Sequence, residues 1–214
     1  MNVITLVTQK GGAGKTTLAA SLAVAAVEAG EKVIALDLDP QGSLATWGNS
    51  REAEAPAVDR IDGAQVGQLS TILAALVKKG FTLAILDTAG IESTSGNLAM
   101  RAATLALIPA RPSRLDLAAT MPTIETLMRM EMRDRFAFVL NQCPTGRSSR
   151  ASEAAGGLRV FGVLAEPLVM QRADHQDAVA AGQGVTEYAP EGRAAHEVRQ
   201  LWRWIDRKLK GKPQ

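Results

Sequence analysis

Eight consecutive residues near the start of the chain could bind phosphate groups. They lie between an apolar run and an alanine-rich segment and read Lys10-Gly11-Gly12-Ala13-Gly14-Lys15-Thr16-Thr17. Glycines let backbone N–H groups approach phosphate oxygens, and the N-terminus of a helix adds partial positive charge. Lys15 could contact the β- and γ-phosphates of a nucleotide, and the Thr16 hydroxyl could ligate Mg²⁺. The spacing therefore predicts a P-loop, in which Gln9 replaces the first glycine of the general pattern and Lys10 is an extra lysine.

Carboxylates come at the ends of two other apolar runs. Asp37 and Asp39 end or follow residues 32–37, and Asp87 ends residues 81–87. Because the carboxyl ends of parallel strands border the crevice in which α/β sheets bind ligands, these three side chains could reach a nucleotide and its metal ion. An aspartate in such a position can instead cap the next helix, and for Asp37 that alternative stays open.

The apolar runs that would position these residues are continuous rather than alternating. Continuous runs are typical of strands buried on both faces, as in a parallel sheet covered by helices. The sequence therefore predicts an α/β fold with a mostly parallel sheet and helices on both faces. We expect strands at residues 2–8, 32–37, 81–87, 104–110, 136–141 and, more weakly, 160–165. We expect helices at residues 15–29, 64–79, 115–133 and 197–210, and a surface loop at residues 50–63.

The composition is that of a globular protein, and we expect one domain over residues 1–214. Hydrophobic residues make up 46% of the chain and charged residues 21%, which excludes a disordered protein. One cysteine, Cys143, and two histidines are too few for a zinc cluster, so a metal ion would be held by oxygen. No apolar run is long enough for a signal peptide or a membrane span, which predicts a cytoplasmic protein.

The string KGGAGKTT resembles the deviant Walker A motif of the ParA/MinD family of ATPases. The segment Asp37-Leu38-Asp39-Pro40-Gln41-Gly42 is similar to the DxDPQG switch segment of ParA proteins, and Asp87 has the position of the Walker B aspartate. Further similarities lie at Pro109–Asp116, at Asn141-Gln142 and at Gln171-Arg172. The resemblance covers most of the chain and implies a P-loop NTPase fold of the SIMIBI type.

The resemblance also implies roles for the charged residues. Asp87 would hold Mg²⁺ through water, Asp37 would support the outer shell of the metal, and Asp39 would activate the attacking water. Lys10 would reach the phosphates bound by the partner subunit in a nucleotide-sandwich homodimer, as an arginine finger does. ParA proteins of this kind hydrolyse ATP, bind DNA non-specifically and position plasmid, chromosome or other cargo, with hydrolysis stimulated by a ParB-like or other small activator. The expected protein is therefore a nucleoid-associated ATPase that uses ATP and Mg²⁺.

One departure from ParA proteins follows Asp87. The residues Thr88-Ala89-Gly90 replace a proline-containing turn, and DTAG resembles the signal-recognition-particle GTPases. Such a GTPase would also carry a carboxylate that reads guanine, and Asn141-Gln142-Cys143-Pro144 offers none. The Asn141 amide both donates and accepts hydrogen bonds, so it could bind the adenine edge, which favours ATP. Gly90 could contact the γ-phosphate as a switch, and a SIMIBI GTPase in protein targeting stays an alternative.

The last expected helix, residues 197–210, has two faces. Its apolar stripe contains Val198, Leu201, Trp202, Ile205 and Leu209, whereas Trp204 lies off the stripe. A second face, here called the basic face, carries Arg199, Arg203, Arg207 and Lys210. This face is either the solvated surface of a packed helix or, as the resemblance to ParA implies, a site for non-specific DNA.

A MinD-like regulator that cycles on and off a membrane is a further alternative. Stable membrane anchoring is not expected, because no apolar anchor follows the final helix. The first expected strand starts at residue 2, so we expect no preceding helix-turn-helix domain and no sequence-specific repression.

Overall fold

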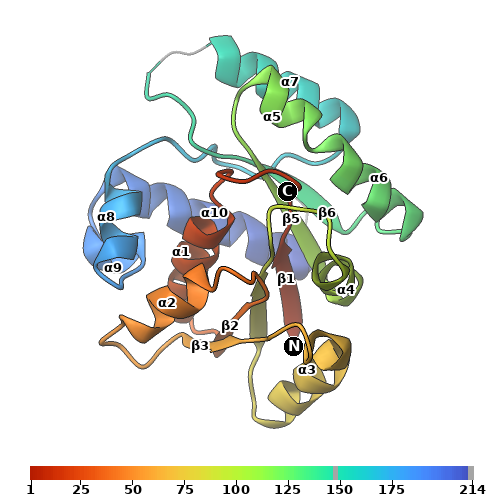
Figure 1. Ribbon diagram of the computed structural model, residues 1–214. Helices are drawn as coiled ribbons and strands as arrows, with labels where there is room; N and C mark the ends of the chain where they lie inside the picture. The colour runs from red at the N-terminus through yellow and green to blue at the C-terminus, as the bar shows by residue number, and fades with distance from the viewer. Residues whose placement is uncertain (147–148, 212–214) are drawn as a thin grey trace.

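The computed structural model describes residues 1–146 and 149–211 and contains a six-stranded sheet (Figure 1). The strand order is β3-β2-β4-β1-β5-β6, and every neighbouring pair is parallel. The strands are β1 (Asn2–Leu6), β2 (Val33–Asp37), β3 (Ala57–Arg60), β4 (Leu83–Asp87), β5 (Leu105–Ala110) and β6 (Phe136–Leu140). The predicted fold class is confirmed.

Helices cover both faces of this sheet (Figure 1). One face is covered by α1 (Lys15–Glu28), α2 (Ser43–Asn49), α8 (Asp174–Ala180), α9 (Val185–Tyr188) and α10 (Arg193–Leu209). The other face is covered by α3 (Leu69–Lys78), α4 (Thr94–Ala102), α6 (Met121–Arg129) and α7 (Ser149–Phe161). A 3-10 turn at Val66–Gln68 precedes α3, and the short helix α5 (Arg114–Ala118) lies beside α7. Both faces of the central strands are therefore buried, as their continuous apolar runs predict.

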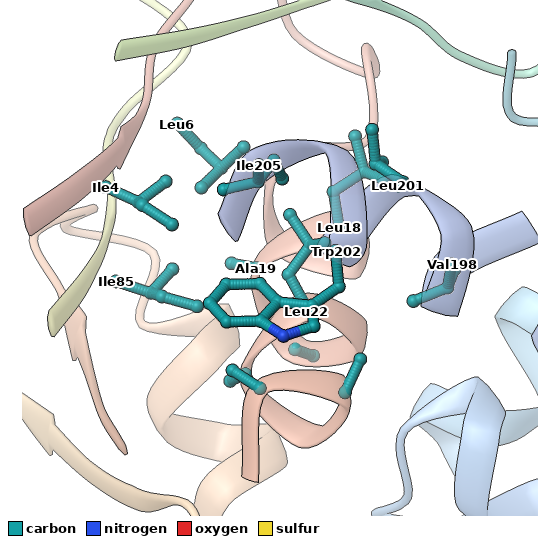
Figure 2. Close-up of a cluster of buried hydrophobic side chains, with 14 of the residues drawn as sticks. Ile4, Leu6, Leu18, Ala19, Leu22, Ile85, Val198, Leu201, Trp202 and Ile205 are labelled. Carbon is teal, nitrogen blue, oxygen red and sulfur yellow. The ribbon is translucent and has the colours of Figure 1, made fainter. Parts of the chain in front are cut away.

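Helix α1 is buried on several sides by the sheet and by α2, α8, α9 and α10. Figure 2 shows Leu18, Ala19 and Leu22 of α1 among side chains of α10 and of the strands, namely Val198, Leu201, Trp202, Ile205, Ile4, Leu6 and Ile85. Small residues such as Ala19, Ala23 and Ala26, all fully buried, let these elements approach closely. A helix that is apolar all round is typical of a core position.

The sheet brings the carboxyl ends of β1, β2 and β4 to one edge. Strand β4 lies between the other two, and Asp87 is in register with both Asp37 of β2 and Leu6 of β1. Side chains at this edge project toward the crevice beyond the strands. The segment that follows β1 and the two aspartates therefore lie close together.

The segment predicted as a surface loop, residues 50–63, contains the edge strand β3. Residues 57–60 pair in register with residues 34–37 of β2. This strand has only four residues, and Asp59 and Arg60 are exposed, so it lacks the apolar run that marks the buried strands. The loop prediction was therefore wrong at these residues.

Two further predictions of secondary structure were wrong. The helix expected at residues 115–133 is divided into α5 and α6, because Pro122 has no N–H to donate to the carbonyl of Ala118. The weak strand expected at residues 160–165 is not formed, since α7 extends to Phe161. Leu164 makes only an isolated bridge with Phe138.

The final helix, α10, starts at Arg193, four residues before its expected start. Its apolar stripe is buried as expected from Val198 to Ile205, and Leu209 is partly buried. Trp204, which was placed off the stripe, is also only 4% exposed. Trp204 belongs to the same hydrophobic cluster as Trp202, so the buried face of α10 is wider than the sequence pattern indicates. Within residues 1–146 and 149–211, no helix has the length and apolar composition needed to cross a membrane.

Candidate functional site

The predicted phosphate-binding loop joins β1 to α1. Gly12 and Gly14 have φ values of 77° and 86°, in the left-handed region that favours glycine. Gly14 immediately precedes α1 and provides no side-chain cap, so the N–H groups of the first helical turn are available to a ligand. Gly11 and Gly12 are exposed. The loop therefore has the backbone and the polarity of an anion-binding site.

Two carboxamides just after β6 hold this loop from the side. Asn141 Nδ2 donates to the Ala13 carbonyl oxygen at 2.9 Å, and Gln142 Nε2 donates to the Gly12 carbonyl oxygen at 3.0 Å. A Cβ atom on Gly14 would lie 2.4 Å from Asn141 Nδ2, so only glycine fits there. Asn141 was expected to bind a base, and no role was expected for Gln142. With its amide directed at the loop, Asn141 can offer a base its carbonyl oxygen.

Lys15 is the first residue of α1 and is only 7% exposed. Burial lowers the pKa of its ammonium group, while the carboxylates of Asp87 and Asp39 act in the opposite direction. Lys15 Nζ lies 3.5 Å from the carbonyl oxygen of Lys10. A buried ammonium group next to an open loop can bind an anion strongly, because little water screens its charge.

Asp87 and Thr16 form a pair that fits Mg²⁺. The Thr16 hydroxyl donates to Asp87 Oδ2 at 2.6 Å, while Asp87 Oδ1 is buried without a hydrogen-bond partner in the described part of the chain. Burial raises the pKa of Asp87 to about 7. The Thr16 hydrogen bond and the Lys15 charge oppose this rise, whereas Asp37 adds to it. A buried carboxylate oxygen without a partner, next to a hydroxyl, supplies the hard oxygen ligands that Mg²⁺ prefers.

Residues 1–146 and 149–211 contain no cluster of three or more His, Cys, Asp or Glu side chains that could hold a metal ion. Mg²⁺ usually keeps several water ligands and binds one or two carboxylates together with substrate phosphates. The Thr16 and Asp87 pair therefore fits a metal ion that arrives with a nucleotide.

Asp37 and Asp39 make different contacts. Asp37 is fully buried, and its two oxygens accept backbone N–H groups from Asp39 at 3.0 Å and from Ala45 at 2.8 Å. Asp37 therefore fixes the start of α2, as expected if this aspartate caps the next helix. Its role in the outer shell of a metal ion stays a prediction. Asp39 is half-buried, and its Oδ1 accepts from the Gln41 N–H at 3.0 Å. This contact orients a carboxylate that water can reach.

Lys10, the extra lysine of the loop, is half-buried and lies near an ion-pair cluster. Arg111 Nε donates to Asp116 Oδ1 at 3.0 Å, and Ser113 hydrogen-bonds the same carboxylate. Although burial raises it, the pKa of Asp116 is lowered overall by these hydrogen bonds and by the charges of Arg111 and Lys10. The Pro109–Asp116 segment, identified from its resemblance, therefore places a carboxylate in the neighbourhood of Lys10.

The DTAG segment lies against the phosphate-binding loop. Thr88 Oγ1 donates to the carbonyl oxygen of Leu6 at 2.8 Å, which joins the ends of β4 and β1. A Cβ atom on Gly90 would lie 3.1 Å from the Gly11 nitrogen, so Gly90 packs on the loop backbone. The next residue, Ile91, is 70% exposed. A change at the loop would therefore reach Gly90 directly.

A cleft opens beside the loop on the side of Asn141. It is lined by Gly14, Thr17 and Leu18, by Asn141 and Gln142, and by Met170, Gln171, Arg172, His175 and Gln176. Thr17 and Asn141, both predicted to bind a cofactor, are thus brought together with the Gln171-Arg172 landmark. Sequence reasoning did not include His175, because no motif accompanies it.

The four residues of the basic face make different contacts. Arg199 donates to Glu28 Oε2 at 2.9 Å and to the carbonyl oxygen of Thr186 at 3.2 Å, and Lys210 lies 2.7 Å from Asp206 Oδ1. Arg203 and Arg207 are exposed, and neither forms an ion pair with any described residue. They line a groove together with Leu164, Glu166, Pro167, Gln200 and Trp204. Of the predicted DNA-binding residues, Arg203 and Arg207 are therefore the two available to a phosphate.

Comparisons with known proteins agree with this geometry. The model of the CobQ/CobB/MinD/ParA nucleotide binding domain matches residues 4–166. The maintenance of carboxysome distribution protein A of Gloeobacter kilaueensis is 28% identical over 209 residues, which cover 97% of this chain and 93% of that protein. The chromosome-partitioning ATPase Soj of Thermus thermophilus is 29% identical, and the alignment covers 92% of each chain.

A solved structure extends the likeness to the fold. The septum site-determining protein MinD of Pyrococcus horikoshii, complexed with Mg-ADP, superposes with a TM-score of 0.77 at 20% identity. The superposition covers 100% of this chain and 99% of that chain. The residues that match the domain model include the loop, Asp37, Asp87 and Asn141, and they end before α8, α9 and α10.

Proposed function

The chain belongs to the CobQ/CobB/MinD/ParA nucleotide-binding domain family, and on this premise we propose that it is a ParA-like ATPase. The observation that carries the proposal is the 2.6 Å hydrogen bond between Thr16 and Asp87, which lies at the N-terminus of α1 beside the buried Lys15. An ammonium group, a hydroxyl and a carboxylate at the end of a glycine-rich loop are the groups that Mg²⁺ and a triphosphate require.

The residues of the loop and the two nearby aspartates, Asp87 and Asp39, would have separate roles in nucleotide binding and hydrolysis. The N–H groups of residues 11–17 would surround the phosphate oxygens, and Lys15 would offset the charge of the β- and γ-phosphates. Thr16 and Asp87 would hold Mg²⁺, which, when bound, neutralises charge that develops on the phosphates. Asp39, oriented by the Gln41 N–H, would position or deprotonate the attacking water.

The active form would be a homodimer that assembles when ATP binds. Lys10 carries a positive charge at the mouth of the loop, in the neighbourhood of Asp116, and could extend toward the phosphates of a second subunit. A cation supplied in this way stabilises the transition state of phosphoryl transfer, as an arginine finger does. Hydrolysis would remove the γ-phosphate and release the partner.

Non-specific DNA is the partner that best fits the basic face. Arg203 and Arg207 present two guanidinium groups without ion pairs to described residues, and guanidinium groups bind phosphate through paired hydrogen bonds. A dimer would present both groups twice, so ATP would strengthen DNA binding through multivalency. Arg199 has a different role here, because its contact with Glu28 fixes α10 to the end of α1.

The cellular role would be the positioning of a cargo in the cytoplasm, on the nucleoid. The relatives described above include a carboxysome-distribution protein, a chromosome-partitioning ATPase and a septum site-determining protein, all named for the placement of something in the cell. A small activator protein that stimulates hydrolysis would convert binding and release of DNA into movement of the cargo.

The enzymatic part of the proposal is tested by phosphate release. The purified protein should hydrolyse ATP only with Mg²⁺, and excess GTP should compete poorly. DNA should raise the rate or the amount of ATP-dependent dimer, whereas liposomes of anionic lipid should not bind the protein during sedimentation. Preferential use of GTP would favour a targeting GTPase, and ATP-dependent binding to liposomes would favour a MinD-like cycle.

The DNA site is tested by charge reversal. The variant with Arg203→Glu and Arg207→Glu should weaken binding to every duplex sequence and reduce the slope of affinity against salt, while ATP binding persists. The matched control carries Arg133→Glu and Arg135→Glu, two exposed arginines at the amino end of β6. Equal DNA affinity of both double variants would show that the basic face is only a solvated surface.

A further inference from the structure

The cleft beside Asn141 has an outer wall that is held in place by the last helix. Residues 170–172 form this wall, and Gln171 N–H donates to the Cys143 carbonyl oxygen at 2.7 Å. From α10, Glu197 accepts the Met170 N–H at 3.1 Å and the Arg172 Nη2 at 2.6 Å. A single carboxylate on α10 therefore fixes both the backbone of the wall at Met170 and the side chain of Arg172.

The contact between Glu197 and Arg172 is largely protected from water. The side chain of Glu197 is 13% exposed and that of Arg172 is 20% exposed. Arg172 Nε also reaches Glu197 Oε1, at 3.2 Å, so both guanidinium contacts share one oxygen while the other oxygen accepts the Met170 N–H. Because the charge of Arg172 is neutralised in this way, the wall offers no free cation to a phosphate group.

The remaining polar groups of the cleft suit an uncharged, planar ligand with donor and acceptor edges. His175 Nε2 is buried and has no hydrogen-bond partner within the described residues. Burial lowers the pKa of His175, although Glu197 and Asp174 oppose this effect and Arg172 adds to it. The ring is therefore neutral at physiological pH and can donate or accept one hydrogen bond. Gln176 adds a carboxamide, and Leu18 adds an apolar surface on the side of α1.

We propose that Glu197 is a positioning residue for the nucleotide base: it holds Arg172 and Met170 so that the cleft can receive the base, with His175 hydrogen-bonding to its edge. This inference rests on the proposed function, because it needs a nucleotide whose phosphates lie on the loop at Gly14. It makes α10 a part of the nucleotide site, even though α10 lies outside the residues matched by the family model. Base binding and the position of the basic face are then linked through one helix.

The test compares ATP with inorganic tripolyphosphate, which has the phosphates and lacks both the ribose and the base. The dissociation constant of tripolyphosphate divided by that of ATP, both measured by calorimetry with Mg²⁺, reports what the base and the ribose together contribute to affinity. In Glu197→Gln this ratio should fall about tenfold, since a hydrogen bond to a charged group is lost, while the affinity for tripolyphosphate stays within about twofold of the parent. Asp206→Asn removes a carboxylate from the same helix that does not line the cleft, and it should leave the ratio unchanged.

A second variant covers the case in which Glu197→Gln unfolds because Arg172 is left with an unpaired charge. The double variant Arg172→Gln with Glu197→Gln removes both charges and should restore the melting temperature while keeping the reduced ratio. An unchanged ratio in a folded variant, or an equal loss of affinity for ATP and tripolyphosphate, would overturn the inference. Failure of the parent protein to bind either compound would instead overturn the proposed function.

Discussion

Replacing Asp87 by asparagine should stabilise the protein at high pH when neither nucleotide nor metal is present. Asp87 is fully buried, and one of its oxygens has no hydrogen-bond partner among the described residues. Burial raises its pKa from 3.8 to about 7 in the folded protein. The unfolded chain would release the proton at the ordinary value, so folding and proton binding are linked at this residue.

The direction and size of the effect follow from this difference. Below the unfolded pKa both states are protonated, and Asp87 imposes no penalty. As the pH rises from 3.8 toward 7, the unfolded state loses its proton first and the folded state becomes less stable by about 1.4 kcal/mol per pH unit. Above the folded pKa the full penalty, roughly 4 kcal/mol, persists. Asparagine has nearly the same shape and does not ionise, so it avoids this penalty.

The assay is urea unfolding of the parent and of Asp87→Asn in EDTA, at several values between about pH 5 and about pH 8.5. The stability advantage of the variant should grow with pH, and its change across the series matters more than its absolute value, because constant effects of the substitution cancel. Mg²⁺ with nucleotide should reduce the advantage, since the ligand compensates the carboxylate of the parent protein. An advantage that does not change with pH would refute the reasoning.

Three further variants test the roles assigned to the loop and the switch segment. Lys15→Ala should weaken nucleotide binding about 100-fold or more in calorimetry, because it removes the buried cation next to the phosphates, and unchanged affinity would refute the assignment. Lys10→Ala should bind ADP normally but fail to dimerise with ATP in sedimentation, and a normal dimer would exclude its action in the partner subunit. Asp39→Ala should keep the ATP-bound dimer while turnover falls about 100-fold, and turnover equal to that of the parent would place the catalytic carboxylate elsewhere.

The sheet and the loop could be predicted because their signals are local. The buried strands β1, β2, β4, β5 and β6 are apolar runs that end close to polar residues, and the glycines of residues 11–14 come shortly after the first of them. Asp37 and Asp87 end two of these strands, so their common position at one edge follows from a parallel sheet. Their separate chemistry does not, because the contact of Asp37 with Ala45 depends on the turn that starts α2.

The features that sequence reasoning missed depend on contacts between distant residues. Arg199 looks like a member of the basic face until the fold brings Glu28 to it. Gln142 acquires a role only because β6 ends beside Gly12. Trp204 lies off the stripe of α10, yet the hydrophobic cluster extends around it. Strand β3 is too short and polar to produce a pattern and forms because β2 offers it a partner.

The burial of α1 also determines where the protein can move when it binds a ligand. Every residue from Leu18 to Ala26 is buried, and the helix contacts the sheet and four other helices, so its opening would require much of the core to unfold. The phosphate site at its N-terminus is therefore ordered before a ligand arrives, and binding loses little conformational entropy there. We expect the amides of α1 to be among the slowest to exchange with deuterium, with or without nucleotide. Changes in exchange on binding should instead be found in the exposed segment around Ile91 and in residues 39–42.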